Sequence, residues 1–202
     1  MIVTHERLNG AMTPEQYLES MHENRERFAS NIAAVRITEE ERAFFAGQPA
    51  PLQVLVLSED WCPDCTTNVP IIVRLARETG GLQVHLLHRD GNEDLADQYQ
   101  RADGRNHIPT YIFFDPSLKE LGHFIERPAA VTQKLQEFRA SWYAAHPETD
   151  PQAPQSTLPA DLRAQFSAEY ADARHQLWDL EQRETIAAFR AIAERVYSAA
   201  AR

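Results

Sequence analysis

The sequence contains only two cysteines and no long apolar run. Cys62 and Cys65 both belong to one Cys-x-x-Cys segment, so the chain cannot hold a framework of several disulfides or a zinc ion bound by four of its own cysteines. The longest nearly apolar run, 52–57, is interrupted by Gln53, and a membrane helix needs roughly 20 apolar residues. The first ten residues lack the basic and apolar segments of a secretory signal. We expect a cytoplasmic protein with local sulfur chemistry and no membrane partner.

Positive charge is also scarce. The 20 Lys and Arg residues face 30 Asp and Glu residues, which gives a net charge of −10, and an acidic surface does not release counterions from a nucleic acid. We therefore expect no nucleic-acid partner. The length of 202 residues suits one ordinary domain plus an appendage. Hydrophobic residues make up 43% of the chain, a composition typical of a globular protein with a packed core.

The first 50 residues predict an N-terminal helical extension, 1–50. A capping-box sequence begins at Thr13, and apolar residues at helical spacing then predict one long amphipathic helix to about Arg36. A second capping box at Thr38 opens a short helix that Gly47 ends.

Strand and helix patterns alternate through residues 51–146. They indicate a strand at 52–58, a helix that ends at Gly80, a strand at 82–87, a helix capped by Asn92 and extending to Tyr99, strands at 111–114 and 121–125, and a helix from Pro128. Parallel strands need crossover helices, whereas the last two strands form a hairpin. The order therefore predicts an α/β fold with a mixed sheet and helices on both faces.

Residues after 146 change character. Four prolines among polar residues make 147–160 a linker. Segment 161–202 then predicts a long C-terminal helical extension, because 161–200 contains no proline or glycine and its apolar residues mostly recur at helical intervals. One such helix would extend roughly 60 Å. It must bend, fold back on the N-terminal helix, or pair with another subunit as a homodimer.

The segment 61–65, Trp-Cys-Pro-Asp-Cys, lies between an expected strand and an expected helix. At a helix N-terminus, Cys62 faces unpaired N–H groups and the positive end of the helix dipole, which lower a thiol pKa. Cys62 is therefore the expected nucleophile, and Cys65, one turn on, the resolving thiol. Asp64 raises the pKa of Cys62 and favours a reducing poise. Half a zinc site is the alternative, but the sequence has no His-x-x-x-His pair, so we expect no metal.

A second feature, Ile108-Pro109, precedes an expected strand. A cis peptide bond before Pro109 would leave backbone groups beside the thiols for an extended substrate. An ordinary trans proline at a strand start is the alternative.

With these features the sequence resembles the thioredoxin superfamily from about 51 to 146, including Pro70 within the helix after the cysteines. The block 57–128, with Arg89-Asp90, Asn92 and Arg127-Pro128, is similar to a bacterial family of uncharacterised thioredoxin-like proteins with a Trp-Cys-Pro-Asp-Cys site. The resemblance implies a thioredoxin-like mixed sheet. Some members of that family lack the second cysteine, which this chain has.

The resemblance also implies a buried aspartate where this chain has Val56, so another acid or base is needed. His107 is our candidate, with a loop histidine of no catalytic role as the alternative. Arg127 should reach the rim of the substrate groove and pair with the Cys62 thiolate or a substrate carboxylate; a surface arginine is the alternative. Trp61, together with Pro63, should pack near the active-site helix and shape the groove.

The expected function is a thiol–disulfide oxidoreductase that acts on a disulfide-bearing protein or a small-thiol substrate. No nucleotide motif is present, so we expect no cofactor, and electrons should come from a separate reductase. Two alternatives remain open: a reductase of mixed disulfides with small thiols, and a thioredoxin-fold interaction module with little turnover.

Overall fold

The computed structural model describes residues 3–195 of the chain. These residues form two compact units. The first unit contains residues up to Arg127 together with those from Thr185 onward, and the second contains Pro128–Glu184. Each unit is described here by itself.

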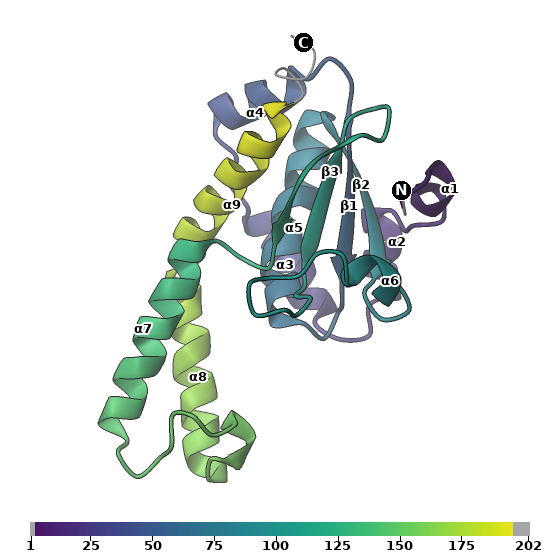
Figure 1. Ribbon diagram of the computed structural model, residues 1–202. Helices are drawn as coiled ribbons and strands as arrows, with labels where there is room; N and C mark the ends of the chain where they lie inside the picture. Colours follow the sequence, from purple (N-terminus) through teal and green to yellow (C-terminus); the bar gives the residue numbers. More distant parts are fainter. Residues whose placement is uncertain (1–2, 196–202) are drawn as a thin grey trace. The chain divides into compact units, whose positions relative to one another are not determined.

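A four-stranded mixed sheet forms the centre of the first unit (Figure 1). The strands are β1 (Leu52–Ser58), β2 (Leu82–His88), β3 (Thr110–Phe114) and β4 (Glu120–Ile125), in the order β2-β1-β3-β4. β1 pairs parallel with β2 and antiparallel with β3, and β3 pairs antiparallel with β4. The predicted mixed sheet with a terminal hairpin is confirmed.

Helix α5 (Pro63–Thr79) makes the crossover between β1 and β2. It contains Pro70, which has no N–H to bond the carbonyl of Thr66. The side chain of Asn31 donates to that carbonyl instead (2.9 Å) and so attaches a neighbouring helix. Gly80 then ends α5 with a φ of 65°, a conformation that glycine adopts at no steric cost.

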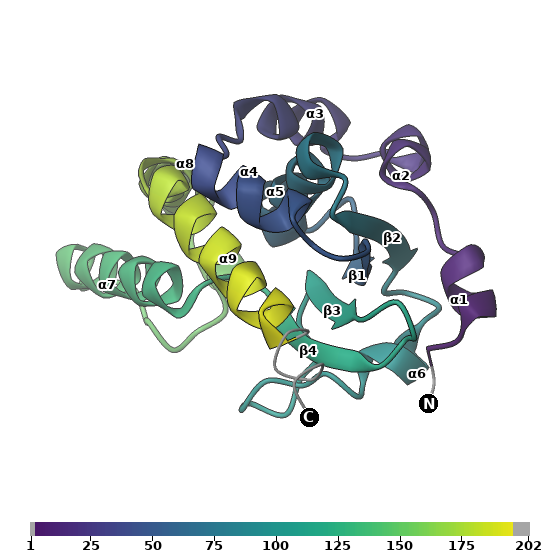
Figure 2. The ribbon, with the colours of Figure 1, turned by 90° about the horizontal axis from the view of Figure 1, so that it is seen from above.

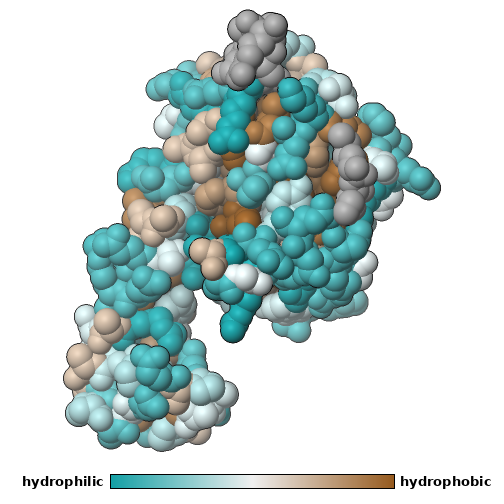
Figure 3. Space-filling model, in the orientation of Figure 1, coloured by the Kyte–Doolittle hydropathy of each residue, from teal (hydrophilic) through white to brown (hydrophobic). Residues whose placement is uncertain are grey.

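Helices cover both faces of the sheet, as expected (Figure 2). α3 (Arg25–Ala34) and α4 (Glu39–Ala46) lie on the same side as α5, and α1 (His5–Asn9) and α6 (Glu93–Ala96) lie on the other. Helix α4 has the predicted capping box and ends at Gly47. Helix α6 is shorter than expected and ends before Tyr99. Polar side chains cover most of the visible surface, and apolar ones are exposed only in patches (Figure 3).

The C-terminal part of α9 (Trp178–Ala193) belongs to the first unit. Its Phe189 ring is fully buried, 4.9 Å from the ring of Tyr111 and 5.4 Å from that of Phe113. Arg190 bonds Glu40, next to the start of α4, at 2.7 Å. This stretch of the extension therefore packs on the sheet and on α4, whereas the arrangement considered from the sequence was folding back on the long N-terminal helix. Val196 and the residues after it lie outside the described part.

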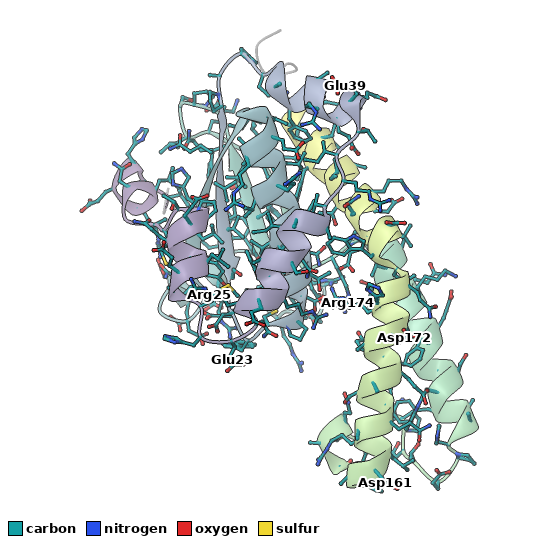
Figure 4. The ribbon with its side chains drawn as sticks, turned by 180° about the vertical axis from the view of Figure 1, so that it is seen from behind. Glu23, Arg25, Glu39, Asp161, Asp172 and Arg174 are labelled. Carbon is teal, nitrogen blue, oxygen red and sulfur yellow. The ribbon has the colours of Figure 1, made fainter. Side chains whose placement is uncertain are left out.

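The single N-terminal helix predicted from Thr13 to Arg36 is wrong. Two helices are present, α2 (Pro14–Ser20) and α3, separated by a turn. Asp60 accepts the backbone N–H of His22 (2.7 Å) and of Glu23 (3.1 Å), and Asn24 takes a left-handed conformation. Figure 4 shows Glu23 at this turn. The break between the two helices is a tertiary effect, because Asp60, which binds the turn, lies 36 or more residues away along the chain.

The second unit is helical. α7 (Ala129–Ala145) leads through the proline-rich segment and the short helix η1 (Gln155–Thr157) to α8 (Ala160–Gln176), and α9 begins at Trp178. The aromatic rings of Trp142 and Phe166 meet edge to face at 4.9 Å. The C-terminal extension is helical, as predicted, and it bends at Leu177, where the chain leaves helical geometry between α8 and α9. A buried ion pair between Arg174 and Glu181 (2.7 Å) spans this break. Within 3–195, no helix has the length and apolarity needed to cross a membrane.

Candidate functional site

Cys62 is the N-cap residue of α5, and Pro63 is the first residue of that helix. β1 ends at Ser58, so the loop between strand and helix places the cysteine at the carboxyl edge of the sheet. The Cys62 Sγ accepts the backbone N–H of Cys65 at 3.3 Å. A proline at this position is favourable, because the first helical N–H groups have no partner within the helix.

The two thiols have opposite electrostatic environments, and both are free thiols in this structure. Hydrogen bonds from the Cys65 thiol and backbone N–H lower the pKa of Cys62, against burial and the nearby Asp64 carboxylate. Burial raises the pKa of Cys65 well above its usual value. Cys62 is 6% exposed and Cys65 1%. Cys62 is thus the more accessible and more readily ionised of the two.

The peptide bond between Ile108 and Pro109 is cis, as predicted. The Cys62 thiol donates to the carbonyl oxygen of Ile108 at 3.7 Å. The carbonyl of Pro109 accepts the backbone N–H of Glu126 at 2.7 Å. The loop before β3 and the end of β4 are therefore joined beside Cys62.

Arg127 extends from the end of β4 to the segment that contains the two cysteines. Its Nη1 lies 2.6 Å from the Asp64 carboxylate and 2.8 Å from that of Glu126. All three side chains are largely buried, with 10–17% of each exposed. Sequence reasoning placed Arg127 near the groove, with the thiolate or a substrate as its partner. In the structure the guanidinium neutralises the carboxylate of the motif itself.

Glu126 is a site residue that sequence reasoning missed. Besides Arg127, its carboxylate contacts Arg101 and the Nδ1 of His107, the latter at 3.3 Å. The His107 Nε2 is 2.8 Å from Asp103, so the histidine proposed as a proton carrier is held by two carboxylates. Glu126 has a φ of 67°, a left-handed conformation uncommon for residues other than glycine. No sequence signal marks this position.

A pair of hydroxyl groups was also missed. The Tyr17 hydroxyl and the Ser58 Oγ are 2.9 Å apart, and both residues are fully buried. Burial raises the pKa of Cys65, and the Ser58 hydroxyl partly offsets this effect. The alternation of a strand places Ser58 on the same face as Val56, a signal that could have identified it.

Trp61 is 46% exposed at the edge of the site, and the guanidinium of Arg89 lies 5.8 Å from its ring centre. Arg89 also pairs with Asp90 at 2.6 Å. Next to them the buried Glu59 contacts His88 at 3.1 Å. In the part of the chain that the structure describes, no three histidine, cysteine, aspartate or glutamate side chains are grouped as metal ligands.

In the comparison with protein families, a family described as Thioredoxin matches residues 11–139 of this chain. The curated proteins give no match. Among solved structures, a protein of unknown function from Pseudomonas aeruginosa is 18% identical with a TM-score of 0.65, over 96% of this chain and 98% of that one. An HIV epitope-scaffold is 17% identical with a TM-score of 0.62, over 95% of this chain and 98% of that one. At these identities the structural likeness concerns the fold alone.

Proposed function

This chain belongs to the thioredoxin family, and from that premise we propose that it is a thiol–disulfide oxidoreductase of the reductase type. Its substrate is a disulfide-bearing protein or a disulfide of a small thiol. Cys62 is the nucleophile and Cys65 the resolving thiol.

The first step is attack by the Cys62 thiolate on one sulfur of the substrate disulfide. A bond forms between the Cys62 sulfur and that substrate sulfur, and the second substrate sulfur leaves as a thiolate that takes up a proton. The lowered pKa of Cys62 raises the fraction of thiolate at neutral pH.

In the second step Cys65 attacks the Cys62 sulfur. The protein disulfide forms, the mixed disulfide breaks, and the remaining substrate sulfur leaves with the electron pair and is protonated. The substrate gains two electrons, and the cysteine pair loses two. A separate reductase then supplies two electrons through a dithiol, which returns the cysteine pair to its thiol form.

The observation that carries this proposal is the position of the Cys62 sulfur. Cys62 is the N-cap residue of α5. Its sulfur accepts the N–H of Cys65 at 3.3 Å and lies 3.7 Å from the carbonyl oxygen of Ile108, the residue before the cis proline. An extended peptide can pair with backbone groups at such an edge. The reacting sulfur therefore lies where a substrate disulfide would be presented.

The test is turnover of a protein disulfide with a dithiol reductant by the wild type, Cys62→Ser and Cys65→Ser. We expect turnover by the wild type only, because Cys62→Ser lacks the nucleophile and Cys65→Ser stops at the mixed disulfide. Equal rates for the wild type and Cys62→Ser would reject the proposal.

The two other functions considered from the sequence give different results in the same experiment. An interaction module would bind partners without covalent capture by Cys65→Ser. A reductase specific for small thiols would reduce a mixed disulfide between a protein and a carboxylate-bearing thiol, with Arg127 near the bound carboxylate, and leave a disulfide within a protein unreduced.

A further inference from the structure

Trp61 comes directly before the nucleophile in the chain, and 46% of its surface is exposed. Within residues 3–195, no other large apolar side chain is exposed to a similar degree. Tryptophan is among the residues that contribute most to binding at protein interfaces. A substrate bound at the Cys62 sulfur therefore lies beside an apolar ring.

The guanidinium of Arg89 lies over this ring. Its Cζ is 5.8 Å from the centre of the Trp61 ring, within the distance of a cation–π interaction, about 6 Å. Only 25% of the Arg89 side chain is exposed. An exposed side chain contributes most to binding when it is already ordered, because ordering it on binding costs free energy. The contact with Arg89 supplies this order.

Arg89 is itself held by several partners. Its backbone N–H donates to the carbonyl of Ser58, at the end of β1, at 3.2 Å. Its Nε donates to Asp90 at 2.6 Å, and its Nη1 donates to the Oδ1 of Asn106 at 3.2 Å. Asn106 in turn donates to Asp97 at 2.7 Å. The position of the guanidinium is therefore fixed by residues from separate segments of the chain.

Asn106 connects this arrangement to the cis proline. It lies two residues before Ile108, whose carbonyl accepts the Cys62 thiol at 3.7 Å. Arg89 therefore joins the segment that carries Trp61 to the loop that ends at the cis proline. Both segments border the Cys62 sulfur.

Arginine can make these contacts at the same time because of its shape. A guanidinium is planar, so its edge can donate to Asp90 and Asn106 while its face lies over a ring. A lysine ammonium keeps the charge but has no flat face and donates from a single atom. The arrangement thus depends on the shape of Arg89 as well as on its charge.

We propose that Arg89 is a positioning residue for substrate binding, which holds the Trp61 ring beside Cys62 and ties it to the loop of the cis proline. The ring contacts the substrate chain next to its disulfide, and Arg89 acts through the ring. This inference rests on the proposed oxidoreductase function and assigns part of the substrate affinity to a contact outside the two cysteines. It changes none of the bonds made or broken in the two steps.

The experiment measures kcat and KM for the reduction of insulin by the wild type and by Arg89→Ala, with dithiothreitol as the reductant. Each disulfide-linked insulin chain carries a dye that stays quenched until the chains separate. We expect KM to rise about fivefold in Arg89→Ala with kcat unchanged, because a disordered ring weakens binding of the substrate and of the transition state alike.

A second substitution tests whether Arg89 acts through the ring. Trp61→Ala should raise KM by a similar factor. The double variant should raise it no further than Trp61→Ala alone, because residues that act through one contact are not additive. Additive effects of the two substitutions would contradict the proposed role.

Two further variants serve as controls. Arg89→Lys keeps the charge and should still show most of the rise in KM. Arg183 also pairs with the next residue in the chain, Glu184, at 3.2 Å, and 65% of its side chain is exposed. Arg183→Ala is therefore the matched control and should leave KM unchanged.

The fluorescence of Trp61 gives a readout that does not depend on turnover. The chain has three tryptophans, so the signal of this ring is the difference between each protein and the same protein with Trp61→Phe. Acrylamide should quench it more strongly in Arg89→Ala, because the guanidinium no longer covers the ring. Arg183→Ala should show the quenching of the wild type.

Thermal unfolding establishes that each variant is folded, and Arg89→Lys suffices if Arg89→Ala does not fold. Unchanged KM or unchanged quenching in a folded Arg89→Ala protein would overturn the proposal. Full recovery of the wild-type KM in Arg89→Lys would also overturn it, since charge alone would then be sufficient. Absence of turnover in the wild type would instead reject the oxidoreductase function itself, and stronger quenching in Arg89→Ala would still show that Arg89 orders Trp61.

Discussion

The two cysteines are separated by one turn of helix but lie in different surroundings. Cys65 is next to a neutral, dry region that contains Ser58 and Tyr17, both without exposed surface. Cys62 is followed by a charged region in which Asp64, Arg127 and Glu126 are joined at 2.6 and 2.8 Å. We call the first the hydroxyl side and the second the ionic side.

The difference between the two sides accompanies opposite pKa shifts of two identical side chains. Burial raises the pKa of Cys65 on the hydroxyl side. On the ionic side the Asp64 carboxylate acts to raise the pKa of Cys62, although the net shift is downward, and Arg127 counters this charge. The ionic side should therefore respond to charge-changing substitutions, and the hydroxyl side should not.

The largest expected effect is on the ionic side. Glu126→Gln removes the carboxylate that joins Arg101, His107 and Arg127, and loss of one partner of a largely buried ion pair costs about 3 kcal/mol. Denaturant unfolding should show this decrease in the free energy of unfolding. Glu148→Gln, at an exposed glutamate, is the matched control and should leave stability unchanged. A Glu126→Gln protein as stable as the wild type would show that the ionic side does not support the fold.

A smaller effect concerns the reactivity of Cys62. Arg127→Gln leaves Asp64 without this guanidinium, so the pKa of Cys62 should rise and its alkylation at neutral pH should slow roughly two- to fivefold. Asp64→Asn removes the charge that raises this pKa and should accelerate alkylation. Rates measured across pH for both variants check this, and shifts of the same sign would contradict the electrostatic explanation.

The smallest expected effect is at Asp60, which holds the turn between α2 and α3. Partial burial opposes its ionisation, but the N–H groups of Glu23 and His22 lower its pKa overall. The folded protein thus favours the carboxylate. Its contribution is fully present above the unfolded pKa of about 3.9 and is lost as pH falls through the lower folded value.

Asp60→Asn should therefore cost about 1 kcal/mol or less at neutral pH and flatten the loss of stability in acid. Unfolding measured from neutral to acidic pH tests this, with the exposed Asp161→Asn as control. The same acid slope in Asp60→Asn and wild type would contradict it.

Local signals predicted much of this protein. The strand at Leu52–Ser58, the helix that Gly80 ends and the capping box at Thr38 depend on neighbours in the chain, and the structure has all three. The predictions failed where distant residues decided the outcome. Asp60 binds the turn after α2 from 37 residues or more away, and this turn divides the predicted long N-terminal helix into α2 and α3.

The Cys-x-x-Cys spacing alone placed two thiols one helical turn apart, because a helix repeats every 3.6 residues. It also placed Cys62 at a helix start, where unpaired N–H groups favour a thiolate. Only the tertiary structure decided what surrounds them. Tyr17, Arg127 and Glu126 come from α2 and the end of β4, and a pKa depends on charges and burial in space, whatever their separation along the chain.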